Sequence, residues 1–174
     1  MNTPIRRLFN ALFSALFFVF LSVLGFTQVS DQQETANQFL QKSMELTQSD
    51  LDSAMVLAYR VEVMAKRLND PKLTAKALHQ LGFIYYSKNQ FDKAIEYFEG
   101  AKKVAKEIGD HTMEAIALNR IGNTYQLKTN YLLALDYYLE ALAINKQSGN
   151  QAEVARTLVN LANVYSVIGQ YQKS

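Results

Sequence analysis

The sequence predicts an all-α fold, a solenoid in which antiparallel helix pairs stack side by side. The first observation is a repeated phrase: residues 81–85 read Leu-Gly-Phe-Ile-Tyr, and similar residues return at 121–125 and 161–165, each 40 positions later. Between these phrases, apolar residues recur three and four positions apart, as on one face of an α-helix. The composition is 49% hydrophobic with only two prolines, which favours packed helices. Self-similarity at a fixed period of this length indicates stacked repeats.

The first helices after the N-terminal segment are the least regular. Residues 33–47 are expected to form a helix with a partial apolar stripe. A second helix is expected to run to residue 68. Ser49 is expected to be its N-cap, with Asp52 placed three residues later to form the reciprocal capping contact. Ala54 keeps the 40-residue register with Ala94, whereas the first helix has no such match. Residues 28–69 are therefore interpreted as a degenerate repeat that caps the stack.

Start and stop signals are clearer from residue 70 onward. Asp70 is expected to be an N-cap, with Pro71 at the first helical position. Gly109 is expected to end a helix in the left-handed conformation, and Asp110 to cap the next one. The expected helices are 72–87, 91–108, 111–128, 131–147 and 151–167, followed by a turn at 169–170. The expected domains are repeats at 70–110 and 111–150 and a truncated partial repeat at 151–174.

Apolar and small residues keep a fixed spacing in these repeats. In the first they are Leu78, Leu81, Gly82, Tyr85, Ala94, Phe98 and Ala101. In the second they are Leu118, Ile121, Gly122, Tyr125, Ala134, Tyr138 and Ala141, and in the third Leu158, Leu161, Ala162 and Tyr165. The pattern resembles the tetratricopeptide repeat, a helix–turn–helix unit usually about 34 residues long. The resemblance implies a right-handed α-solenoid with a concave binding face.

Two glycines in this pattern lie inside expected helices. Glycine within a helix costs about 1 kcal/mol relative to alanine, so Gly82 and Gly122 need a compensating contact. We expect the rings of Phe98 and Tyr138 to lie over them.

The first helix of each pair should line the concave face. The residues expected there are Lys76, His79, Phe83, Tyr86, Ile116, Asn119, Asn123, Gln126, Arg156, Val159, Asn163 and Ser166. Our candidate peptide- or partner-binding residues are all of these except Ile116, Val159 and Ser166.

Asn119, Asn123 and Asn163 are favoured within this set, because one amide offers both a donor and an acceptor to an extended peptide. The 40-residue length and the triplet Ile121-Gly122-Asn123 resemble the long-repeat, Leu-Gly-Asn branch of the family. In that branch the asparagine binds the peptide backbone. A departure from the family is Lys106 and Lys146 in place of the helix-ending proline. The alternative is that these asparagines are solvated residues on an exposed helix face.

Residues 1–27 resemble a secretory signal. Arg6 and Arg7 precede an apolar stretch over residues 8–26, and small residues at 25 and 27 suit cleavage before Gln28. The alternative is an uncleaved membrane anchor. Either way, the remaining chain is expected outside the cytoplasm, periplasmic or secreted.

Charge and composition restrict the partners. The formal net charge is +2, and the segment 1–27 carries two arginines and no acidic residue, so the rest of the chain is neutral. A neutral chain gives no electrostatic reason to expect nucleic acid or a membrane surface. The chain has no cysteine, and His79 and His111 lack the spacing of paired metal ligands. We therefore expect no enzyme, metal or cofactor.

Two functions remain open from the sequence. The first is an exported scaffold that binds a peptide or partner protein in its concave groove. The second is the sensory part of a longer signalling protein, with a histidine-kinase or transcription-regulator output. Leu158, Leu161 and Tyr165 are expected to face a helix that this chain lacks, which predicts a fragment or a surface that docks onto another chain.

Overall fold

The computed structural model describes residues 28–171, without the side chains of the last two, so the expected signal segment at 1–27 lies outside the described residues. The chain divides into two compact units, Met1–Thr35 and Ala36–Ser174. In the first unit, the described residues 28–35 are helical. None of the helices described here combines the length and hydropathy needed to cross a bilayer. The following description concerns the second unit.

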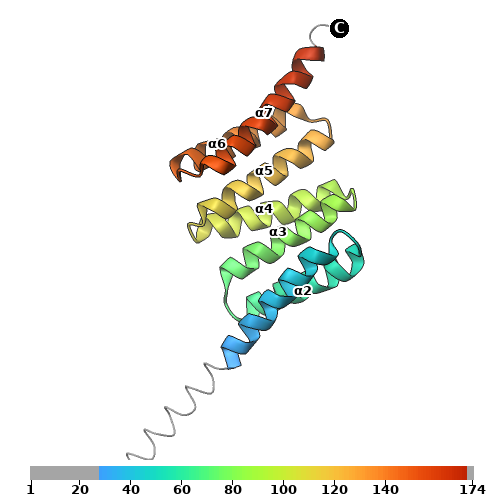
Figure 1. Cartoon of the computed structure of the whole chain (residues 1–174), viewed down its shortest axis with the longest axis vertical. Helices are drawn as coiled ribbons and strands as arrows, with labels where there is room; N and C mark the ends of the chain where they lie inside the picture. The colour runs from blue at the N-terminus through green and yellow to red at the C-terminus, as the bar shows by residue number, and fades with distance from the viewer. Residues whose placement is uncertain (1–27, 172–174) are drawn as a thin grey trace, which may run out of the picture. The chain divides into compact units, whose positions relative to one another are not determined.

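The second unit consists of helices in the part that the structure describes, and no strand lies between residues 36 and 171. Residues 36–46 are helical, and the helices that follow are α2 (Leu51–Arg67), α3 (Pro71–Ser87), α4 (Phe91–Glu107), α5 (His111–Leu127), α6 (Tyr131–Gln147) and α7 (Gln151–Tyr171). Each labelled helix contacts the next one along the chain (Figure 1). In addition α3 contacts α5 and α5 contacts α7, so these first helices of successive pairs lie together on one face. The predicted all-α solenoid of antiparallel helix pairs is confirmed.

The helix boundaries follow from local capping. The Asp70 carboxylate accepts a hydrogen bond from the backbone N–H three residues later at 2.9 Å, and Asp110 does the same at 3.0 Å. Gly109 and Gly149 both adopt a φ of +70° after their helices end, a conformation that glycine reaches without steric cost. The predicted N-caps Asp70 and Asp110 and the predicted helix end at Gly109 are confirmed, and Gly149 repeats the same helix end 40 residues later.

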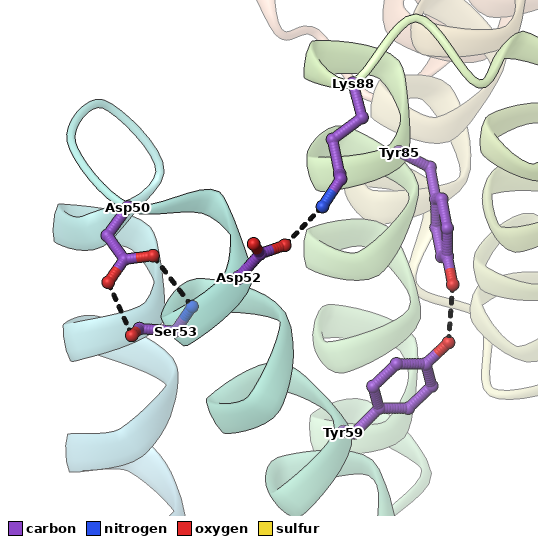
Figure 2. Close-up of polar contacts among 6 residues, drawn as sticks. All are labelled: Asp50, Asp52, Ser53, Tyr59, Tyr85 and Lys88. Atoms are coloured by element: carbon purple, nitrogen blue, oxygen red, sulfur yellow. Dashed lines mark hydrogen bonds and ion pairs between the residues drawn. The ribbon is translucent and has the colours of Figure 1, made fainter.

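Two predicted boundaries are wrong. The N-cap of α2 is Asp50, not Ser49, because the Asp50 carboxylate accepts from the Ser53 backbone N–H at 3.0 Å and from the Ser53 hydroxyl at 2.6 Å (Figure 2). The expected turn at 169–170 is absent, and α7 continues to Tyr171. No described helix packs beyond α7 there, so no contact favours a turn over continued helix.

The predicted contacts over the helix-interior glycines are confirmed. A Cβ atom built on Gly82 would lie 2.6 Å from the ring of Phe98, and one built on Gly122 would lie 2.6 Å from the ring of Tyr138. Both rings are fully buried. Because Gly82 and Gly122 have no side chain, the aromatic ring of the second helix can reach the core of each pair.

Polar contacts connect α2 to the next pair. Lys88 forms an ion pair with Asp52, and the hydroxyl groups of Tyr59 and Tyr85 lie 2.8 Å apart (Figure 2). The Tyr59 hydroxyl also lies 2.9 Å from that of Tyr97 on α4. The three hydroxyls satisfy one another at a partly buried junction, which fixes the register between neighbouring pairs.

The outer face of α7 is only partly covered. Leu158 and Tyr165 are 48% and 55% exposed, as expected for residues without a second helix over them. Leu161 is 5% exposed, and it packs in the same cluster as Tyr138 and Leu142 of α6. The expectation that Leu161 lacks a partner is therefore wrong, because its side chain turns back toward the preceding pair.

Candidate functional site

A cavity of about 580 Å³ opens on the face formed by the first helices. Its lining side chains come from three consecutive first helices and are Asn37, Leu40, Gln41, Met44 and Thr47 (residues 36–47), Lys76, His79, Gln80 and Phe83 (α3), and Met113, Ile116 and Arg120 (α5). This size lies within the range of ligand-binding pockets, about 300–1,000 Å³. We call this cavity the concave pocket.

The floor of the concave pocket is held by hydrogen bonds between helices. The Gln80 side-chain amide donates to the hydroxyl of Ser43 at 3.2 Å and to that of Thr47 at 2.9 Å. The Ser43 hydroxyl in turn donates to the backbone carbonyl of Ala54 at 2.7 Å. These bonds connect α3 to residues 43–47 and leave the apolar side chains on both sides of them facing the cavity.

Arg120 is the main cationic group of the concave pocket. Its guanidinium lies 5.2 Å from the centre of the Phe83 ring, within the range of a cation–π contact. Burial lowers the pKa of Arg120, and no carboxylate in residues 28–169 forms an ion pair with it. The guanidinium therefore lies beside an aromatic wall, without a neutralising partner from the described chain.

His79 contributes a second nitrogen group to the wall. Its ring centre lies 5.6 Å from that of Phe98, and its Nε2 atom is buried without a hydrogen-bond partner among the described residues. Burial, and secondly the positive charge of Arg120, lowers the pKa of His79 to about 4. The imidazole is therefore neutral at neutral pH, with one ring nitrogen unsatisfied.

Four of the nine candidate residues gather around the concave pocket. Lys76, His79 and Phe83 line it, and Tyr86 stacks on Phe83 with the ring centres 6.2 Å apart and the planes 11° from parallel. Ile116, which was expected on the same face, also lines the cavity.

The expectation that Asn119 lies open in the groove is wrong. Its side chain is 5% exposed and donates to the Thr157 hydroxyl of α7 at 3.0 Å. Val159, 40 residues later, is 59% exposed because no described helix follows α7. The Asn119 side chain therefore faces the next pair and not the groove.

Asn123 and Gln126 are half-buried, and both already accept a hydrogen bond from within the chain. The Tyr138 hydroxyl lies 2.6 Å from the Asn123 side-chain oxygen and 3.0 Å from that of Gln126. Asn123 therefore holds the ring that fills the space over Gly122, in addition to any contact with a partner. Arg156 and Asn163 are exposed on α7, and Arg156 pairs with Glu153 at 3.3 Å. None of these four predicted residues lines the concave pocket.

Sequence reasoning missed Arg120, Met113, Gln80 and the contribution of residues 37–47. Gln80 and Arg120 each follow an expected groove position by one residue, a rotation of about 100° that turns them toward the preceding first helix. Extending the expected set by this one position would have found both. The helix at 36–46 was missed as a wall because its apolar stripe does not keep the 40-residue register.

No group of three or more potential metal-ligating side chains occurs in the described part of the chain. His111 is 67% exposed in its side chain and lies 3.4 Å from the Glu114 carboxylate at the start of α5. This pair lies outside the concave pocket.

Solved structures resemble the chain closely in fold. Aspartyl phosphate phosphatase F from Bacillus subtilis matches with a TM-score of 0.76 at 17% identity, over 80% of this chain and 37% of that one. A signal transduction ATPase with a tetratricopeptide repeat sensor from Pyrococcus horikoshii matches at 0.72 and 20%, over 82% and 22%. The apo form of RapI matches at 0.73 and 20%, over 82% and 40%. The chain thus spans less than half of each of these solved chains.

No curated protein matches the sequence. The sequence profile of the tetratricopeptide repeat matches residues 73–147 and 113–174, which together make up more than half of the chain. The chain belongs to the tetratricopeptide-repeat family.

Proposed function

We propose that this protein is an exported helical-repeat scaffold that binds a peptide or a partner-protein segment in the concave pocket. The observation that carries the proposal is a cavity of about 580 Å³ walled by side chains of three consecutive first helices. Phe83, Met113 and Ile116 give it apolar walls, while His79 and Arg120 give it convergent polar groups. This combination is typical of binding sites. The proposal includes no catalytic role and no cofactor.

The remaining candidate residues extend this site along the same helices. Tyr86 continues the aromatic wall from Phe83, and Asn123, Gln126, Arg156 and Asn163 follow on α5 and α7. The division into a capping repeat at 28–69, repeats at 70–110 and 111–150 and a partial repeat at 151–174 belongs to the same proposal. Its basis is the 40-residue register of the sequence.

Replacing Phe83 with alanine should weaken peptide binding at least about tenfold, because aromatic anchors supply much of the energy of such interfaces. The probe is a phage-displayed library of random dodecapeptides selected on the whole chain, followed by titration of the selected peptides. Tyr165→Ala, which removes an aromatic ring outside the pocket, is the matched control and should bind as the parent does. Failure to select any peptide, or equal binding by Phe83→Ala with unchanged helicity, would contradict the proposal.

Export is supported by the two arginines before the apolar stretch at residues 8–26 and by the small residues before Gln28. N-terminal sequencing of the protein recovered from its native host should find Gln28 as the first residue. A chain that keeps its first 27 residues and stays with the membrane would point to the anchor. Recovery from the cytoplasm would contradict export in either form.

A sensory role is the second candidate. It is supported by the solved signal transduction ATPase, whose tetratricopeptide repeats are described as a sensor and of which this chain matches 22%. In such a role the concave pocket is the input site, so the first function is retained and an output region is added.

A further inference from the structure

The charged groups that line the concave pocket are of one sign. Lys76 and Arg120 are its basic residues, His79 adds a polar nitrogen, and no Asp or Glu is among the lining residues. The other lining side chains are apolar or carry an amide, except for the hydroxyl of Thr47. A partly enclosed cavity with a cationic lining attracts an anionic group more strongly than an open surface would, because the effective dielectric beside protein atoms is lower than in bulk water.

The surroundings of Arg120 leave its charge uncompensated. Glu153 is the one carboxylate with an appreciable electrostatic effect on Arg120, and this carboxylate is itself paired with Arg156 at 3.3 Å. Arg156 repels Arg120 in turn. A half-buried guanidinium without an ion-pair partner gains a charge-assisted hydrogen bond when a ligand brings a carboxylate.

The Nε2 atom of His79 supplies a second, independent indication of a ligand. It is buried in the pocket wall and has no hydrogen-bond partner among the described residues. Buried polar atoms are nearly always paired in native structures, so an unpaired one in a cavity wall points to a group that the cavity receives. A neutral imidazole nitrogen can exchange one hydrogen bond with a peptide backbone, the direction depending on the tautomer.

We infer that the concave pocket takes an acidic peptide segment, an Asp or Glu flanked by apolar side chains, and this inference rests on the proposed function. The carboxylate binds Arg120, with Lys76 adding positive charge at the mouth. An apolar neighbour in the peptide packs on Phe83 and Ile116, and its backbone satisfies His79 Nε2. The match of a carboxylate to an unpaired cation and of apolar side chains to the walls selects this occupant.

The test compares two matched peptide libraries on the whole chain. Both contain terminally blocked heptapeptides with mixed Leu, Ile, Phe, Val and Met at the flanking positions. The central residue is Glu in one library and Gln in the other, and the blocked ends remove any terminal carboxylate. We expect the Glu library to bind at least about tenfold more tightly, since a hydrogen bond to a charged partner is worth more than a neutral one.

Variants separate the charge of Arg120 from its packing. Arg120→Gln should remove the preference for Glu over Gln, whereas Lys103→Gln, which removes an exposed cation of α4 outside the pocket, should keep it. Arg120→Lys keeps the charge and should retain part of the preference with unchanged helicity. Added salt should reduce the preference in the parent chain.

The outcomes distinguish a failure of the acidic specificity from a failure of the proposed peptide-binding function. If the Gln library binds as tightly as the Glu library and Phe83→Ala weakens both, the pocket binds peptides but the acidic specificity is wrong. If free glutamate competes as effectively as the Glu peptides, the occupant is a small carboxylate and the peptide assignment is overturned. If neither these libraries nor the random dodecapeptides bind, both proposals fail.

Discussion

Gly82→Ala is expected to lower the free energy of unfolding by about 1–3 kcal/mol, although alanine is the better helix former. The added Cβ atom would lie 2.6 Å from the Phe98 ring, closer than atoms in contact approach. Phe98 is fully buried, so the ring has no free space into which it can turn. The overlap must be relieved by moving α4 away from α3, which loosens the core of the pair.

Gly100→Ala is the matched control, and its effect should have the opposite sign. Gly100 also lies inside a helix, but a Cβ atom there would meet Leu78 at 3.5 Å, an ordinary contact distance. Alanine should therefore raise stability by about 0.5–1 kcal/mol through helix propensity. Urea unfolding followed by circular dichroism measures both variants. Stabilisation by Gly82→Ala would show that the ring contact does not set the spacing of the pair.

The agreement at these glycines shows what the sequence could predict. A glycine inside an amphipathic helix, with an aromatic residue at a fixed distance in the next helix, has few physical explanations other than close packing. The helix ends at Gly109 and Gly149 were equally predictable, because they depend on φ values that few residues adopt. These features are local or lie within one pair, where the chain itself fixes the distances.

The side chains between pairs were harder to predict. His79 and Asn119 share one repeat position, and the sequence placed both in the groove. Asn119 is instead covered by α7, to which it donates a hydrogen bond, whereas His79 lines the concave pocket, since the curvature of the stack decides which side of α3 or α5 meets its neighbour. Curvature is a sum of packing contacts along the stack, and no short pattern in the sequence encodes it. Arg120, one residue further round, reaches the pocket for the same reason.

An ion pair between neighbouring repeats recurs in the 40-residue register and is then replaced by apolar residues. The ion pair between Asp52 and Lys88 returns 40 residues later between Asp92 and Lys128. The next positions in that series carry Leu132 and Ile168, so both charged partners are replaced together by apolar residues. A single replacement would leave one charge unpaired, whereas the joint change removes both. Because exposed ion pairs contribute about 0–1 kcal/mol, the exchange alters stability little and changes surface chemistry more.

Leu132 is 72% exposed, and Leu139 of the same helix is 47% exposed. Leu158 and Tyr165 on α7 are exposed as well, so α6 and α7 both present large apolar side chains at the surface. The concave pocket lies on other helices, between residues 36–47, α3 and α5. Binding in the concave pocket and any contact at these four apolar residues therefore use separate surfaces.

The stability of the protein should fall as the pH drops from about 6.5 to about 4, in part because of His79. Its pKa lies near 4 in the folded chain and near 6.5 when exposed, since burial and secondly Arg120 oppose the charged ring. Below pH 6.5 the imidazole of His79 binds a proton in the unfolded chain but not in the folded chain, so unfolding becomes more favourable as the pH falls. The difference amounts to about 3 kcal/mol at pH 4 and below, and it vanishes above pH 6.5.

Replacing His79 with glutamine isolates this contribution, because glutamine does not titrate while the carboxylates of the chain remain common to all variants. Urea midpoints measured from pH 4 to pH 7 should fall less steeply for His79→Gln than for the parent. His111→Gln, which removes an exposed imidazole, controls for the loss of one histidine from the unfolded chain. A His79→Gln curve parallel to that of the parent would mean that the ring is solvated when folded, and Nε2 would then need no ligand group to satisfy it.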